Sequence, residues 1–383
     1  MFNFAQKFWR QSSARASSGF HVERPLVLLQ SDDWGRVGVR DQEGYEALRA
    51  AGIRLGEHPY DFYTLETADD VNAVRELLKR HRDCTGRSAC MEMNFVTANL
   101  DFDQIARDKF GNISLRPLTQ GLPGKWRRPG LFEAYRSGID DGIFSPSLHG
   151  LTHFCQVSVE HAIAKNKDRS QLLRLLWSAE TPYIYWRMPW VGYEYENPGK
   201  PKPGALSAAS QDKLIEQAAN IFAQLFSRRA TSACAPGYRA NADTHQAWSK
   251  QGIRVAQNGS GSPLAPNLDE FGILNLHRTI DFEPGQKDLP VEKYMQLAEG
   301  CFSRGVPAII SIHSINFHSS LKDFRTATLF ALDEFLTMLE KRFPNLLYVH
   351  GMDVYDIVTR GKFRSLSGLV SVTASLQNAA TRN

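Results

Sequence analysis

The chain has 383 residues, of which 42% are hydrophobic, so it can bury a large core as one big α/β domain or two smaller ones. Lys and Arg number 45 against 41 Asp and Glu, and a net charge of +4 is too even to indicate nucleic-acid binding through overall charge. No run of about 18 apolar residues predicts a membrane-spanning helix. Five cysteines without a CxxC pair indicate neither a disulfide framework nor a thiolate zinc site.

The first residues, 1–10, carry aromatic and basic side chains but lack the apolar segment and small-residue cleavage site of a secretory signal. We therefore expect a cytoplasmic protein without a transmembrane segment. A weak contact of this segment with a membrane surface stays open, and the sequence indicates no oligomeric state. Residues 1–23 are predicted to form an N-terminal extension and residues 362–383 a C-terminal tail.

Between these ends, short apolar runs alternate with helical patterns, which is typical of parallel βαβ construction. Strands are predicted at 26–30, 91–97, 143–147, 233–235, 253–257, 273–276, 308–312 and 346–349. Eight strands fit a barrel better than an open sheet. Apolar residues at three-to-four spacing predict helices at 42–51, 68–82, 212–227, 242–250 and 326–342, and Pro344 is a suitable stop after the last.

The predicted organisation is a single domain over residues 24–361 with loop insertions near 112–130 and 181–207. The second loop holds six aromatic residues: Tyr183, Tyr185, Trp186, Trp190, Tyr193 and Tyr195. Loops at the carboxyl ends of strands commonly carry substrate recognition, so these rings could stack on sugars. Simple packing of the loop against the core is the alternative.

The first candidate site residues, Asp32 and Asp33, follow the apolar run at 26–29. Adjacent residues on an extended chain point in different directions, so one carboxylate could bind a metal while the other faces a reacting water. The plainer alternative is that one Asp caps a turn and the other is solvated.

His149 and His153 follow the predicted strand at 143–147. Residues four apart on one helical turn converge, and two His with one carboxylate form a known catalytic zinc set that leaves a position open for water. Coincidence or local hydrogen bonding is the alternative for this spacing alone. Together with the aspartate pair at another strand end, the pattern favours a mononuclear metal site.

Two further segments contribute candidates. In Cys234-Ala-Pro-Gly-Tyr-Arg239, a Pro-Gly turn at a strand end could hold backbone amides toward an oxyanion, and Arg239 could fix a carboxylate, although an ordinary βα turn has the same sequence signature. The apolar strand at 308–312 delivers His313 at its end, where a neutral-range pKa would suit proton transfer to a leaving amine. A satisfied core histidine is the alternative.

In their order and spacing these segments resemble the polysaccharide deacetylase family, carbohydrate esterase family four, from about residue 25 to residue 357. The resemblance implies a distorted (β/α) barrel of the glycoside hydrolase/deacetylase type, with long loops over its carboxyl-terminal face. It also implies that Asp32 is the general base, that Asp33, His149 and His153 bind a divalent metal, usually zinc, that the Tyr238 amide serves the oxyanion hole, and that His313 is the general acid.

The sequence departs from the family pattern at two positions. Cys234 stands where the family has an arginine that tethers the base, and Arg239, across the turn, is the expected substitute. No Asp-Trp motif that would orient His313 is found, and Asp281 is the candidate for that role. Trp34, Asn316 and His318, which flank the motifs, are candidate substrate contacts, as is Arg239.

The resemblance therefore implies a metal-dependent hydrolase that removes an N-acyl group, with N-acetyl the foremost candidate, from an amino sugar of a poly-, oligo- or activated saccharide. Without a signal peptide, a nucleotide- or lipid-linked sugar in surface-polysaccharide metabolism is favoured over a finished wall polymer. One alternative is a deformylase or O-acyl esterase with the same metal site. The other is a non-catalytic carbohydrate-binding protein on a degraded deacetylase fold.

Overall fold

The computed structural model describes residues 19–199, 204–259, 265–287, 289–365 and 368–377. Its centre is one sheet with strands in the order β11 (Asn267–Leu268), β12 (Leu274–His277), β10 (Val255–Asn258), β9 (Ser232–Cys234), β6 (Phe144–Leu148), β3 (Met91–Phe95), β2 (Leu26–Trp34), β14 (Ala308–His313) and β13 (Ile280–Asp281), with β15 (Leu347–Tyr348) also beside β2. All pairs are parallel except β11 with β12. All eight predicted strands belong to this sheet.

The strand order fits a distorted barrel that strand pairing does not close within the described residues. On one side of β2 the neighbouring strands are, in order, β3, β6, β9, β10 and β12. On the other side of β2 they are β14 and then β13. The chain itself crosses from β12 to β13 over Arg278 and Thr279. Within the described residues no strand pairing joins β12 to β13, so this crossing bridges the seam. The α/β class is confirmed.

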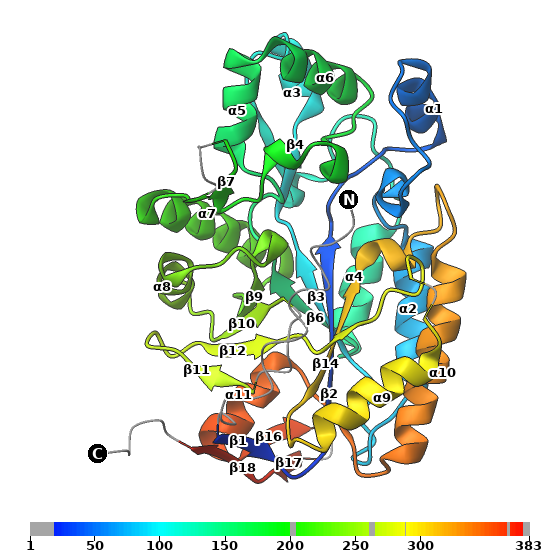
Figure 1. Cartoon of the computed structure of the whole chain (residues 1–383), viewed down its shortest axis with the longest axis vertical. Helices are drawn as coiled ribbons and strands as arrows, with labels where there is room; N and C mark the ends of the chain where they lie inside the picture. Colours follow the sequence, from blue (N-terminus) through cyan, green and yellow to red (C-terminus); the bar gives the residue numbers. More distant parts are fainter. Residues whose placement is uncertain (1–18, 200–203, 260–264, 288, 366–367, 378–383) are drawn as a thin grey trace, which may run out of the picture.

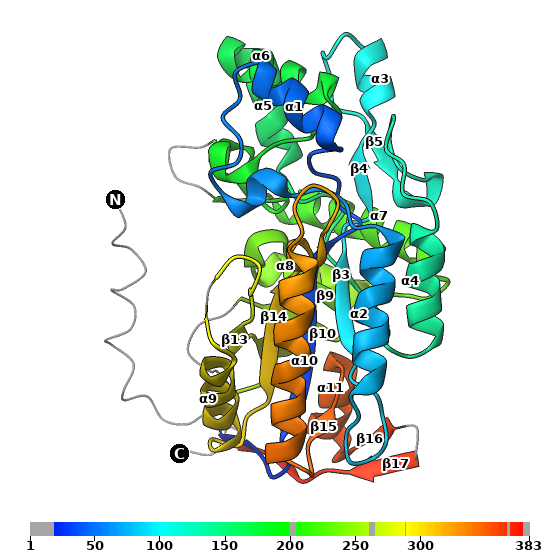
Figure 2. The same cartoon turned by 90° about the vertical axis from the view of Figure 1, so that its right-hand side faces the viewer.

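The described helices are α1 (Gln42–Ala50), α2 (Ala68–Arg80), α3 (Phe102–Arg107), α4 (Leu131–Asp140), α5 (Gln156–Lys165), α6 (Lys167–Ser178), α7 (Ala208–Phe226), α8 (Ala242–Lys250), α9 (Val291–Phe302), α10 (Arg325–Arg342) and α11 (Gly351–Arg360). Figure 2 shows α10 and α2 side by side along the barrel, and α10 also packs against α9. The five predicted helices correspond to α1, α2, α7, α8 and α10. Helix α10 ends two residues before Pro344, as expected.

The two ends of the barrel differ. In Figure 1, α1, α3, α5 and α6 lie at the upper end, toward which the arrows of β2 and β14 point. The strands β1 (Gly19–Val22), β16 (Lys362–Ser365), β17 (Gly368–Ser371) and β18 (Ala374–Gln377) lie at the opposite end, where β1 pairs with β18 and β16 with β17. Residues 362–377, expected as a tail, thus form strands where described. Residues 1–18 and 378–383 of the predicted extension and tail lie outside the described residues.

Both predicted insertions are mostly irregular. The first contains β5 (Leu115–Pro117), which pairs with β4 (Ala98–Leu100), and the second contains β7 (Glu196–Asn197), which pairs with β8 (Gly204–Ala205). Residues 200–203 of the second insertion are outside the described part. Among the described helices, none has the length and apolar character needed to span a bilayer.

The apolar run of β2 reflects the position of this strand in the core. All nine residues of this strand are buried, because β3, β14 and β15 flank it and helices cover the barrel. The register of β2 with β14 pairs Asp32 with His313. Two of the predicted site residues are therefore neighbours on adjacent strands.

Candidate active site

A cavity of about 300 Å³ lies at the carboxyl end of the barrel strands. Strand-end residues form its floor, and residues of the surrounding loops form its walls. Its lining consists of Asp32, Asp33, Arg36, His58, Tyr60, His149, His153, Tyr185, Trp186, Tyr193, Gly237, Tyr238 and His313. Six of the predicted site residues therefore share one cavity.

The aspartate pair lies within β2 and not after it, because the strand continues to Trp34. Its pairing with β3 shifts between Ser31 and Trp34, and Asp33 has a φ of 73° in the left-handed region. A bulge of this kind re-aims consecutive side chains. Asp32 consequently contacts Arg278, which lies between β12 and β13. Asp33 contacts His149 and His153 in the loop after β6.

Asp33, His149 and His153 form the predicted cluster. The Oδ1 atom of Asp33 lies 3.5 Å from Nε2 of His149 and 3.1 Å from Nε2 of His153. Asp33 Oδ1 and His149 Nε2 are both buried without a hydrogen-bond partner. Lone pairs that face one another in this way suit a cation, and one carboxylate with two imidazoles is a donor set that zinc accepts. The residues therefore fit a divalent metal.

The other ring nitrogens of the two histidines are also engaged. His149 Nδ1 lies 2.9 Å from the carbonyl oxygen of Cys234, so it donates, and Nε2 is left as the acceptor. His153 Nδ1 lies 3.4 Å from the Tyr183 hydroxyl. Partners of this kind fix the tautomer and orientation of a metal ligand.

The expected helical turn between His149 and His153 is wrong, because these residues follow β6 as irregular loop. Gly150 has a φ of 81° and turns the chain. The buried carboxylate of Glu194 accepts hydrogen bonds from the amides of Leu151 and Thr152. The two imidazoles therefore converge because Glu194 holds the loop between them. The four-residue spacing alone could not predict this contact.

Arg36 is a charged neighbour that the sequence analysis did not identify. Its Nη1 lies 2.9 Å from Oδ2 of Asp33, and its guanidinium lies over the ring of Tyr63. Burial would by itself raise the pKa of Asp33, but Arg36 and His153 outweigh it and hold that pKa well below its ordinary value. The pair leaves Oδ1 as the oxygen that faces the histidines.

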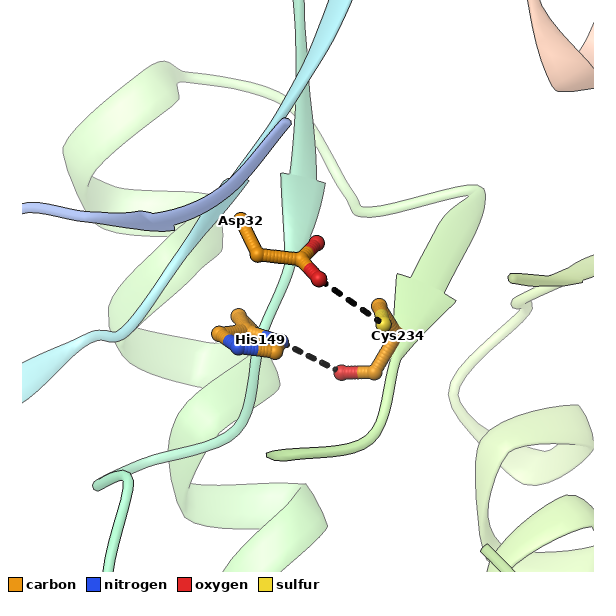
Figure 3. A group of neighbouring side chains, drawn as sticks. All are labelled: Asp32, His149 and Cys234. Carbon is orange, nitrogen blue, oxygen red and sulfur yellow. Dashed lines mark hydrogen bonds between the residues drawn. The ribbon is translucent and has the colours of Figure 1, made fainter. Parts of the chain in front are cut away.

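A second group, Asp32, His149 and Cys234, also brings its side chains together (Figure 3). Figure 3 shows the Cys234 thiol beside Asp32, with Sγ 3.9 Å from Oδ2, and the Cys234 carbonyl beside His149. Burial holds the pKa of the thiol well above its ordinary value, so Cys234 remains protonated. Asp32 already pairs with a guanidinium. The Asp33 cluster is consequently the better cation site.

Arg278 provides the tether that the Cys234 position lacks. Its Nη1 and Nη2 each lie 2.6 Å from one oxygen of Asp32, and Asn94 donates to Oδ1 at 2.7 Å. Burial alone would raise the pKa of Asp32, but the charge of Arg278 lowers it far below its ordinary value. Arg239, expected in this role, is 53% exposed and lies 3.8 Å from Glu196, so that expectation is wrong.

His313 pairs with Glu283 and not with Asp281, which is exposed. His313 Nδ1 lies 2.5 Å from Oε1 of Glu283, and Asn316 donates to the other oxygen of that carboxylate. Burial lowers the pKa of His313, but Glu283, together with Asp32 and Asp33, outweighs it and raises that pKa to about 9. Its Nε2 lies 4.0 Å from Oδ2 of Asp32. Asn316 is itself fully buried, so it positions Glu283 and does not line the cavity.

The turn after β9 also differs from expectation. The amide of Tyr238 donates to the Ala235 carbonyl at 2.8 Å and is therefore already engaged. It is the hydroxyl of Tyr238 that reaches the centre, donating to Asp32 at 3.1 Å. Gly237, with a φ of 61°, lies against Tyr193, whose ring would be 2.5 Å from an added Cβ. Only glycine fits this approach without a shift.

Aromatic residues of the second insertion line the cavity beside the candidate metal cluster. Tyr185, Trp186 and Tyr193 contribute side chains, and the Tyr193 ring stands edge-on to His153 at 5.6 Å. Tyr195, by contrast, is fully buried. The loop therefore uses some rings for packing and presents others to the cavity.

Two predicted substrate contacts are wrong. Trp34 is fully buried and stacks on Phe317 at 5.9 Å, so it belongs to the core. His318 is also buried, with Nε2 3.4 Å from Glu66. Trp34 follows Asp33 directly and His318 lies five residues after His313, but neither side chain lines the cavity.

No protein-family model matches the sequence. No curated protein matches it significantly either. Similar solved structures include a putative polysaccharide deacetylase from Mycobacterium smegmatis, with 11% identity, a TM-score of 0.46, and coverage of 90% of this chain and 92% of that one. A probable polysaccharide deacetylase from Pseudomonas aeruginosa PAO1 has 12% identity, coverage of 87% and 90%, and a TM-score of 0.46. Puue allantoinase has 11% identity, coverage of 94% and 99%, and a TM-score of 0.48.

Polysaccharide deacetylases, which the motifs resemble, are thus among the structurally similar proteins.

Proposed function

We propose that the protein is a metal-dependent hydrolase that removes an N-acyl group, with N-acetyl as the expected group, from an amino sugar. The observation that carries the proposal is the Asp33 cluster, whose unpartnered, buried Oδ1 and Nε2 atoms face one another in the cavity that also holds Asp32 and His313. Asp33, His149 and His153 would hold the ion, with Zn²⁺ the expected one.

A divalent ion bound there would polarise the acyl carbonyl and lower the pKa of a water molecule. Asp32 is ionised and held in one orientation by Arg278, so it can accept a proton from an attacking water.

His313 is suited to the opposite transfer. With a pKa of about 9 it carries a proton at neutral pH, and Glu283 fixes its ring through Nδ1. Nε2 therefore faces the cavity as the donor to a departing amine. Because Nε2 lies 4.0 Å from Asp32, proton acceptor and proton donor serve the same reacting group.

A non-catalytic binding protein is less well supported. That alternative rests on the missing arginine at position 234 and the missing partner of His313. Arg278 and Glu283 make those two contacts from other positions. The rings of Tyr185, Trp186 and Tyr193 would stack on a sugar in either case.

The decisive experiment is the bound-metal content of the purified full chain beside a His149→Ala/His153→Ala double variant. His161→Ala, on the exposed side of α5, is the matched control. We expect near-stoichiometric divalent metal in the wild type and in His161→Ala, and none in the double variant. A wild type that binds no ion after reconstitution contradicts the proposal.

The acyl group is tested by turnover on N-acetyl, N-formyl and O-acetyl sugars with the reconstituted protein. The N-acetyl and N-formyl sugars differ by one methyl, which is worth about 1–3 kcal/mol in a fitted pocket, so their kcat/KM values should separate by about tenfold or more. Preference for the N-formyl or O-acetyl sugar would replace the N-acetyl assignment while the metal site stands.

A further inference from the structure

The loop between the two candidate metal ligands depends on a carboxylate from a distant segment. The amide of Leu151 lies 2.9 Å from Oε1 of Glu194, and the amide of Thr152 lies 2.8 Å from the same oxygen. Leu151 and Thr152 are buried, so these amides have no access to water. Without Glu194 both donors would lose their partner, which is unfavourable for buried amides.

Close packing also sets the shape of this loop. Gly150 has a φ of 81°, and a Cβ at this position would lie 2.1 Å from Oε2 of Glu194. The carboxylate thus occupies the space beside the turn that a side chain would otherwise fill. The His149–His153 loop and Glu194 fit one another as a unit.

Glu194 also connects this loop to the wall of the cavity. It follows Tyr193, whose ring lines the cavity and stands edge-on to His153. An isolated bridge between Tyr193 and Glu196 closes the turn around it. The segment that presents an aromatic ring to the substrate space therefore also anchors the backbone between the histidines.

From these contacts we infer that Glu194 is a positioning residue that fixes the spacing of His149 and His153 and couples the aromatic loop to the metal site. The inference rests on the proposed function, because it concerns the geometry of that site. Glu194 does not line the cavity, so it acts through its contacts with Leu151 and Thr152.

The test compares Glu194→Ala and Glu194→Gln with Glu180→Ala in the full chain. Glu180 is a matched control because it is another buried glutamate that accepts a backbone amide, that of Lys125 at 2.7 Å, and it does not line the cavity. Zn²⁺ affinity is measured by competition with a chelating dye, and the melting temperature of each metal-free form is recorded.

We expect Glu194→Ala to weaken Zn²⁺ binding by about 10- to 100-fold, as for other residues that orient a metal ligand. Glu194→Gln should recover much of the loss, because its amide oxygen can still accept both hydrogen bonds. Glu180→Ala should lower the melting temperature without changing the affinity. Equal Zn²⁺ affinity in wild type and Glu194→Ala would overturn the inference and leave the proposed function intact.

A wild type that binds no Zn²⁺ would instead contradict the proposed function. In that case amide hydrogen exchange in segment 148–155 decides whether Glu194 anchors the loop. Faster exchange at Leu151 and Thr152 in Glu194→Ala supports the anchoring contact, and unchanged exchange overturns it.

Discussion

Asp32 and Asp33 are adjacent aspartates that are equally buried, with 2% exposure each, yet their carboxylates have different hydrogen-bond partners. Both oxygens of Asp32 accept hydrogen bonds from Arg278. Asp33 pairs with Arg36 through one oxygen and leaves the other without a donor. The unpartnered oxygen is what makes Asp33 the candidate ligand, and the fully engaged carboxylate is what makes Asp32 unsuited to that role.

The bulge in β2 creates this difference. A regular strand would alternate the two side chains between the barrel interior and the helical layer. Because the register shifts between Ser31 and Trp34, both carboxylates reach the cavity, one toward the seam at Arg278 and the other toward the loop at His149. A local irregularity thus places two charges with different partners at one strand end.

Asp33→Asn is the change with the largest expected effect. The amide keeps the shape but removes the charge that faces His149 and His153, so we expect the metal to be lost and kcat/KM to fall by about 10⁴-fold, because metal chemistry supplies several kcal/mol. Elemental analysis and turnover are measured on the same sample. A variant that retains stoichiometric metal would show that Asp33 is not a ligand.

Asp32→Asn sharpens the comparison, because it is the same substitution one residue earlier. We expect the metal to stay and kcat to fall by about 10³-fold, the size of a lost general base. If metal content falls with activity, as in Asp33→Asn, the two aspartates share one role and the assignment of Asp32 as base is wrong.

Much of this site was predictable because its residues follow predicted strands. The carboxyl ends of parallel strands meet at one end of a barrel, so strand-end polar residues at 32, 33, 149, 153 and 313 were expected to converge. The structure confirms that convergence, since all five line one cavity. Their catalytic roles remain proposals.

The contacts of Arg278 and Glu283 could not be predicted from local pattern. Arg278 is 246 residues from Asp32 in the chain, and the contact depends on where the barrel seam falls. A charged residue two positions after the apolar run at 273–276 was the available signal. Trp34 and His318 were wrongly predicted as substrate contacts, because a position near a motif does not determine whether the side chain faces the cavity or the core.

Arg278→Lys tests the seam contact, with Arg239→Lys as the matched control. Lysine keeps the charge but cannot make the two-pronged contact with Asp32, so we expect kcat to fall by about 10- to 100-fold with metal content unchanged. Arg239 is 53% exposed, and its substitution should leave kcat within about twofold. A larger loss of kcat in Arg239→Lys than in Arg278→Lys would show that Arg239, and not Arg278, holds Asp32 in place.

Glu283→Gln has the smallest expected effect on activity at neutral pH, and its signature is a pH profile. In the wild type His313 keeps its proton up to a pKa of about 9, so the activity of a general acid falls as pH rises through that value. Removing the Glu283 charge removes the strongest cause that raises this pKa, while burial, which lowers it, stays. The alkaline limb of kcat/KM should therefore move to lower pH, while Asp281→Asn, at the exposed position, should leave it in place. An unmoved limb in Glu283→Gln would show that His313 does not set it, and the proton donor would then have to be sought elsewhere in the cavity.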